Sequence, residues 1–169
     1  LEQFPDTHRM FVGPRADLFN KKLKGYNEKI SRLIESSEAP GQVHFTGVIE
    51  DDDRYLRAAD IVVLASDREG TPNSVLEAMA TGLPCIVTPF AGISRGIGDP
   101  DIHYRLVDRE AEAISLVMRS YLKEPELAIE QGKAGRGFVM ENADRNQTLD
   151  QYVELYRELG SAALSRRKR

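Results

Sequence analysis

The stretch ADIVVLASDREGTPNSVLEAMATGLPCIVT, residues 59–88, is the most informative part of the sequence for the fold. Ile61–Leu64 and Cys85–Thr88 are short, continuous apolar runs, the pattern of parallel strands that are covered on both faces. Between them, Pro72–Thr81 has apolar residues at helical spacing and a proline suited to a helix start. A strand, a helix and a second strand in this order predict a βαβ unit of a parallel sheet.

The same alternation continues on both sides of this unit. Further strands are predicted at His8–Val12, Val43–Thr46 and Tyr104–Val107, and further helices at Asp17–Glu35, Asp52–Ala59, Glu110–Leu122, Pro125–Met140 and Ala143–Leu159. The predicted fold class is therefore α/β, a Rossmann-like parallel sheet with helices on both faces. Gly160 is expected to end the last helix, so we assign residues 1–160 to one domain and residues 161–169 to a disordered basic tail.

Composition narrows the class of protein. The 169 residues are 41% hydrophobic and 30% charged, which is typical of one soluble domain. The formal net charge of −4 gives the chain no general attraction to nucleic acid. The single cysteine, Cys85, excludes a disulfide within the chain, and no apolar run approaches the ~18 residues of a membrane span. We expect a cytoplasmic protein and, because the sequence opens at Leu1 in the middle of a helical pattern, a fragment of a longer one.

The loop after Ile61–Leu64 is the first candidate for a binding site, because parallel sheets bind ligands beyond the carboxyl ends of their strands. A helix start there offers backbone amides without intrahelical partners, which suit a phosphate or a sugar hydroxyl. The predicted binding residues are Gly70, Thr71 as N-cap, Pro72, Asn73 and Ser74.

Two carboxylates, Glu69 and Glu77, lie on either side of this anion site. Carboxylates accept hydrogen bonds from sugar hydroxyls, so a diphosphate flanked by two sugars, that is a nucleotide sugar, would satisfy every group. The alternative needs no ligand: Ser74 and Glu77 have the Ser-x-x-Glu spacing of a capping box, with Glu69 a solvated loop residue. Spacing alone leaves both interpretations open.

The segment REGTPNSVLEAMATGLPCIVT, residues 68–88, closely resembles the Glu-x7-Glu motif of retaining GT-B glycosyltransferases of the family 4 type. The segments VHFTGVI and YLRAADIVVLAS are similar to the family's elements before that motif, and GKAGRGFV and YVELYREL to its closing helices. The resemblance therefore covers nearly the whole chain and indicates the C-terminal, donor-binding domain of a GT-B fold with its first βα unit truncated.

The resemblance implies a role for each matching residue. Glu77 would accept hydrogen bonds from the ribose hydroxyls, and Glu69, the catalytic candidate, would contact the transferred sugar near its reacting carbon. The amides of residues 70–74 would hold the sugar and diphosphate, and the nucleobase would lie against a loop made of Gly47, Val48 and Ile49. Thr71 stands where many members have an aromatic residue, which leaves the packing of the sugar undefined.

The implied activity is transfer of a sugar from a UDP- or GDP-sugar to an acceptor, with retention of configuration and without a metal or other cofactor. The acceptor would be bound mainly by an N-terminal domain outside this sequence, and the family's basic Arg/Lys pair, which contacts the diphosphate, would precede Leu1 in the truncated first βα unit. We therefore expect this fragment alone to be inactive. Lipid-linked acceptors are common in the family, which leaves a peripheral position at the inner membrane face open for the full-length protein. The alternatives are a non-catalytic nucleotide-sugar-binding module and a nucleotide-sugar epimerase of GT-B fold.

Two other groups of residues invite a metal-site interpretation. Glu50–Asp53 is an acidic run, which we interpret as the start of a helix, where carboxylates favour the dipole. His8, His44 and His103 lack the spacing of metal ligands, and structural roles are expected for them.

Overall fold

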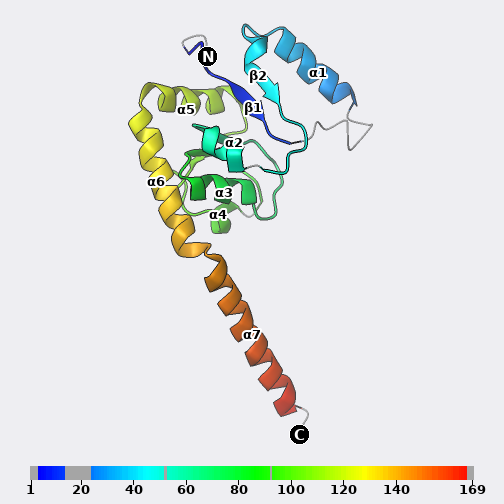
Figure 1. Ribbon diagram of the computed structural model, residues 1–169, viewed down its shortest axis with the longest axis vertical. Coiled ribbons are helices and arrows are strands. Elements are labelled where there is room, and N and C mark those ends of the chain that lie inside the picture. Colours follow the sequence, from blue (N-terminus) through cyan, green and yellow to red (C-terminus); the bar gives the residue numbers. More distant parts are fainter. Residues whose placement is uncertain (1–3, 14–23, 52, 92, 167–169) are drawn as a thin grey trace.

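The computed structural model describes residues 4–13, 24–51, 53–91 and 93–166 (Figure 1). Its strands are β1 (Arg9–Phe11), β2 (Val43–Phe45), β3 (Val62–Leu64), β4 (Cys85–Val87) and β5 (Arg105–Leu106). Its helices are α1 (Lys24–Glu35), the 3-10 turn η3 (Pro40–Gln42), α2 (Asp53–Ala58), α3 (Asn73–Thr81), α4 (Ile93–Gly96), α5 (Ala111–Lys123), α6 (Pro125–Asn142) and α7 (Arg145–Arg166).

The strands pair in parallel throughout, which confirms the predicted Rossmann-like α/β class. Within the described residues they form two hydrogen-bonded groups, β1–β2 and β3–β4–β5, where a single sheet was expected. In the larger group Leu64 pairs with Val87, so β3 and β4 end at the same level. The loops that follow these strands therefore leave the sheet side by side, and one of them is the predicted binding loop.

The core lies around α3 and β4, as continuous apolar runs predict. Its buried members are Val75, Ala78, Met79, Cys85, Val87, Phe90, Ile97, Tyr104 and Val139. Gly82 closes α3 with φ +88°, a left-handed conformation that glycine adopts without steric cost. This turn matters because α6 packs against it.

Helix α6 packs against α3, and two glycines of α6 make the approach close. Gly132 and Gly135 are both buried on the face of α6 that meets the core. A Cβ added at Gly135 would lie 2.9 Å from the carbonyl oxygen of His103 and 3.1 Å from Cγ of Met79. The glycines therefore set the distance between α6 and the elements beneath it.

The sequence expectation fails at the C-terminal end of the chain, and at the N-terminal end it is tested only in part. The helix predicted over residues 17–35 begins at Lys24 in the described part, and residues 14–23 lie outside it. Gly160 does not end the last helix: α7 continues to Arg166, so residues 161–166 are helical where a disordered tail was expected. A glycine inside a helix costs about 1 kcal/mol relative to alanine. The alanines and the leucine that follow Gly160 are strong helix formers, which favours continuation of the helix.

Helix α7 extends away from the rest of the chain in Figure 1. Its described side chains are largely exposed from residue 151 to residue 160. No helix among the described residues combines the length and apolar character needed to cross a membrane.

Candidate functional site

The start of α3 differs in detail from the sequence expectation. Pro72, with φ −78° and ψ 73°, is the N-cap, and no side chain caps the helix. Its carbonyl oxygen accepts hydrogen bonds from the amides of Val75 at 2.9 Å and Leu76 at 3.2 Å. The prediction of Thr71 as N-cap is therefore wrong, because the first helical hydrogen bonds begin one residue later.

This start also decides against the capping box. In that motif the serine is the N-cap and the glutamate is the third helical residue. Here α3 begins at Asn73, so Ser74 is already its second residue and Glu77 its fifth. Glu77 lies more than one turn inside the helix and is exposed, which removes the interpretation of Ser74 and Glu77 as a cap.

The predicted binding loop and the first turn of α3 lie directly beyond the end of β3. Glu69 is half-buried there, whereas Gly70 and Thr71 are exposed. A Cβ at Gly70 would meet no atom within 4 Å, so the space beside its backbone is open. Ligands can approach the main chain closely at such a position.

The amides of the loop are only partly available. The amide of Asn73 has no partner within α3, as expected, but it donates to the carbonyl oxygen of Thr71 just before the helix at 2.9 Å. Ser74 lies in the first turn, where an α-helix supplies no carbonyl four residues back. Its side chain and that of Asn73 are exposed, while Pro72 is buried.

The second predicted segment, Gly47 to Ile49, follows β2 at the carboxyl end of the other strand pair. Gly47 has φ +70°, which turns the chain after the strand, and it bridges to Gly13. Thr46 braces the turn, since its Oγ1 accepts from the amide of Gly13 at 3.2 Å and donates to the carbonyl oxygen of Gly47 at 3.0 Å. Val48 is 72% exposed beyond this braced turn. The structure thus places both predicted segments at carboxyl ends of strands, but in separate strand groups.

Sequence reasoning missed Arg109, which joins the loops at this edge of the β3–β4–β5 sheet. It follows β5, and its Nη2 donates to the carbonyl oxygens of Ser66 at 2.9 Å and Pro89 at 2.5 Å. Its Nε reaches Oγ1 of Thr88 at 3.4 Å. One guanidinium therefore ties together the segments after three neighbouring strands. The signal available in the sequence was an arginine two residues after the last predicted strand, Tyr104–Val107.

Thr88 adds a buried hydroxyl to the hydrogen bonds that Arg109 makes at this edge of the sheet. It is fully buried, and its hydroxyl donates to the carbonyl oxygen of Ser66 at 2.9 Å. The hydroxyl of Ser66 in turn donates to the carbonyl oxygen of Arg68 at 3.0 Å, one residue before Glu69. The base of the Glu69 loop is thereby fixed to the sheet by side chains from its neighbours.

The described residues contain no group of three or more His, Cys, Asp or Glu side chains that could hold a metal ion. In the acidic run, Asp51 pairs with Arg54 at 2.8 Å and Asp53 with Arg57 at 2.9 Å, while residue 52 lies outside the described part. Asp53 is in the first turn of α2, as the helix-start interpretation predicts.

Cys85 and the histidines have structural surroundings. Burial raises the pKa of the Cys85 thiol to about 12, so it stays protonated and is a poor nucleophile. Nδ1 of His8 lies 2.8 Å from Nε2 of His44 across β1 and β2. Nδ1 of His103 accepts a hydrogen bond from the amide of Asp99 at 2.8 Å.

Residues 1–138 match the family model described as glycosyl transferases group 1. The chain belongs to this family. The match includes β1 to β5, the Glu69 loop, α3 and most of α6.

Individual relatives agree with this assignment. The chain is 28% identical over 127 residues to N-acetyl-alpha-D-glucosaminyl L-malate synthase of Bacillus anthracis, covering 75% of this chain and 33% of that protein. Sucrose-phosphate synthase of Thermosynechococcus elongatus matches with a TM-score of 0.78 and 26% identity over 90% of this chain and 38% of that one. Anabaena HepE, solved in complex with UDP, matches with a TM-score of 0.82 and 16% identity over 91% and 42%. The fold is that of GT-B glycosyltransferases, and the chain spans well under half of each of these proteins.

Proposed function

We propose that this chain is the nucleotide-sugar-binding part of a retaining glycosyltransferase of family 4. The observation that supports this most is the start of α3, where a helix without a side-chain cap has Glu69 before it and Glu77 in its second turn. In this proposal the backbone of residues 70–74 holds the sugar and diphosphate, and Glu77 accepts hydrogen bonds from the ribose. The Gly47, Val48 and Ile49 segment lies against the nucleobase.

Glu69 is proposed to act on the transferred sugar. Glu69 is half-buried and lies three residues after Ser66, whose carbonyl oxygen is bound by Arg109. The Glu69 carboxylate would hold sugar hydroxyls and stabilise positive character at the anomeric carbon. Amides in the first turn of α3 would stabilise the charge that develops on the departing diphosphate. The diphosphate would leave from the same face of the sugar that the acceptor hydroxyl attacks, so the anomeric configuration would be retained.

The donor is proposed to be a UDP- or GDP-sugar. UDP has the support of the Anabaena HepE structure, which was solved in complex with UDP. We propose no cofactor and no metal requirement. For the full-length protein we propose an acceptor bound mainly by a further domain, and a cytoplasmic position that extends to the inner membrane face if the acceptor is lipid-linked.

The proposal can be tested by an NMR titration of the ¹⁵N-labelled chain with UDP, GDP and their glucose conjugates. The expected result is a set of amide shifts at Gly47–Ile49 and Gly70–Glu77 for one nucleotide, unchanged by EDTA. Glu77→Gln should weaken binding about tenfold, because a carboxylate accepts charge-assisted hydrogen bonds from hydroxyls and an amide does not. Glu126→Gln, an exposed glutamate in the first turn of α6, is the matched control and should bind as the parent does.

Two results would contradict the proposal. Shifts that cluster elsewhere would place the nucleotide at another site. Equal affinity of the parent chain and Glu77→Gln, with both spectra folded, would remove Glu77 from the site.

A further inference from the structure

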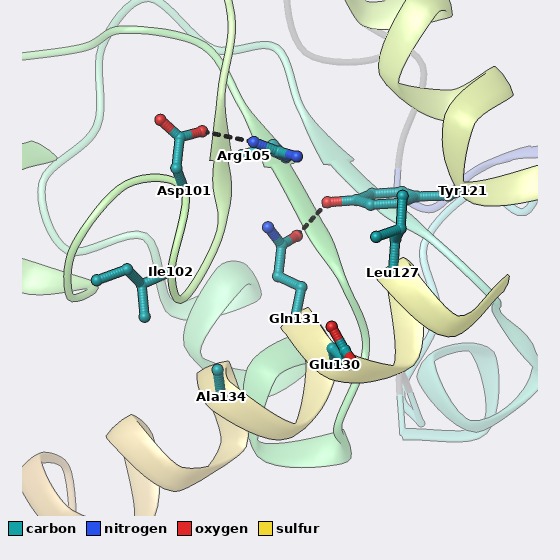
Figure 2. A pocket seen from close by; sticks show the side chains of 8 residues that line it. All are labelled: Asp101, Ile102, Arg105, Tyr121, Leu127, Glu130, Gln131 and Ala134. Atoms are coloured by element: carbon teal, nitrogen blue, oxygen red, sulfur yellow. Dashed lines mark hydrogen bonds and ion pairs between the residues drawn. The ribbon is translucent and has the colours of Figure 1, made fainter. Parts of the chain in front are cut away.

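A cavity lies beside the first residue of β5, away from the Glu69 loop (Figure 2 shows its lining). It has a volume of about 260 Å³ and opens between the loop before β5 and the helices α5 and α6. Its lining residues are Asp101, Ile102, Arg105, Tyr121, Leu127, Glu130, Gln131 and Ala134. Because Arg105 is the first residue of β5, this cavity is at the amino end of the strand and separate from the loops that Arg109 joins.

The inner wall of the cavity presents hydrogen-bond donors. Gln131 and Tyr121 are only 7% and 3% exposed. The Tyr121 hydroxyl donates to Oε1 of Gln131, and burial raises the pKa of Tyr121 to about 12, which keeps that proton in place. The amide nitrogen of Gln131 is therefore turned away from Tyr121 and toward Arg105 (Figure 2). Gln131 lines the cavity, so its amide nitrogen offers two N–H donors to a ligand there.

The rim of the cavity presents acceptors. Asp101 pairs with Nη1 of Arg105 at 3.0 Å but keeps 67% of its side chain exposed, so it retains acceptor capacity. The carboxylate of Glu130 is exposed at the same opening. One arginine and two carboxylates leave the lining with a net negative charge.

The remaining wall is apolar. Ile102, Leu127 and Ala134 line it, and Ile102 and Leu127 are 57% and 38% exposed. Apolar side chains at a partly open cavity offer contact to the carbon skeleton of a small ligand.

The combination selects one class of ligand. An inorganic or organic phosphate would be repelled by Asp101 and Glu130, and a simple amine would offer no acceptor to the amide donors of Gln131. Hydroxyl groups both donate and accept, so a neutral polyhydroxyl ring satisfies both walls at once. We propose that this cavity is a binding site for a monosaccharide unit, either free or at the end of a glycan, distinct from the nucleotide-sugar site.

The test is an NMR titration of the ¹⁵N-labelled chain with D-glucose and with N-acetyl-D-glucosamine, beside sodium phosphate and methylamine. We expect millimolar binding of at least one sugar, with amide shifts at residues 101–105 and 127–134 and little response of those residues to phosphate or methylamine. Shifts at Glu69–Ser74 would report the proposed donor site instead, so the two proposals can fail independently. A disaccharide that ends in the same sugar distinguishes a free ligand from a glycan end.

Three variants make the assignment specific. Ala134→Leu fills the cavity without touching its polar groups, and Gln131→Glu keeps an acceptor for Tyr121 but removes both amide donors. Glu130→Gln tests the rim, with Glu141→Gln, an exposed glutamate on the same helix outside the cavity, as its control. We expect about a fivefold or greater loss of affinity for the first two variants, a smaller loss for Glu130→Gln and none for the control.

The proposal is overturned if no sugar shifts the cavity residues at the highest concentration tested. It is equally overturned if a folded Ala134→Leu chain binds sugar as the parent does, or if phosphate or methylamine shifts the same residues as strongly as the sugars.

Discussion

Three glycines of α6 differ in what a side chain would meet, and replacing each by alanine tests how closely this helix packs. A Cβ at Gly132 would overlap the carbonyl oxygen of Gly82 in the left-handed turn that closes α3. At Gly135 it would lie 2.9 Å from the carbonyl oxygen of His103, tighter than ordinary contact. At Gly137 it would meet nothing within 4 Å. The helical propensity gained is the same in all three cases, so the differences report packing alone.

The expected magnitudes follow from two opposing effects. Alanine stabilises a helix interior by about 1 kcal/mol relative to glycine, whereas overpacking typically costs about 1–3 kcal/mol. We expect Gly137→Ala to raise the free energy of unfolding by roughly 0.5–1 kcal/mol. Gly135→Ala should lower it by about 1 kcal/mol, the cost of overpacking less the helical gain. Gly132→Ala should lower it by about 2–3 kcal/mol or more, because both clashing groups are backbone and neither can rotate away.

The assay is urea unfolding followed by far-UV circular dichroism, with thermal unfolding as a second measure. For a chain of this size each kcal/mol corresponds to about 2–4 °C in Tm. The order of stability should be Gly137→Ala, parent, Gly135→Ala, Gly132→Ala. If Gly132→Ala were as stable as the parent, α6 would not lie against the Gly82 turn, and the account of the core would be wrong.

Three further predictions concern the network at the sheet edge and the buried titratable groups. Thr88→Val should lower the free energy of unfolding by about 0.5–1.5 kcal/mol in urea unfolding, because the Ser66 carbonyl loses the Thr88 hydroxyl and keeps only Arg109 as a side-chain donor. Arg109→Ala should speed amide hydrogen exchange in residues 66–70, whereas Arg109→Lys should restore part of the protection; unchanged exchange in the alanine variant would refute the anchoring role. The free energy of unfolding should fall above about pH 9, because burial raises the pKa of Cys85 and Tyr121 to about 12 and the unfolded chain therefore loses these protons at lower pH than the folded chain. Cys85→Ala should make the free energy of unfolding depend less steeply on pH between about pH 9 and 10.

The helices and strands of the fold could be predicted from the sequence because local patterns of apolar residues determine them. Each predicted strand is present, shortened by one or two residues at its ends, since apolar runs such as Cys85–Thr88 have to be buried wherever they are placed. The short α4 and η3 span only four and three residues, too few to show a period. Gly160 was misjudged because a single helix breaker is weak evidence against strong helix formers on both sides.

The details of the site depend on contacts that no local pattern specifies. The N-cap of α3 is Pro72, one residue later than the predicted Thr71, and this helix start excludes the capping box. Arg109 was missed because its acceptors, the carbonyl oxygens of Ser66 and Pro89, are 43 and 20 residues away in the sequence. Backbone carbonyls leave no signature in a sequence, so such an anchor emerges only once the strands are placed in register.

The absence of a side-chain cap on α3 bears on why two carboxylates flank the start of this helix. A serine, threonine, aspartate or asparagine N-cap would stabilise the helix by about 1 kcal/mol, but its oxygen would occupy an amide of the first turn. Pro72 provides no such oxygen, so the helix relies on its buried face, with Val75, Ala78 and Met79, for its stability. The first turn then keeps donors for an external acceptor, and exposed Glu77 and half-buried Glu69 supply acceptors beside it. Such a local departure from the rules of helix stability is expected where a segment serves a ligand. Pro72→Ser tests the role of this helix start, since a serine that caps α3 would occupy an amide of the first turn and should weaken UDP binding. Unchanged binding by a folded Pro72→Ser chain would dissociate the helix start from the ligand.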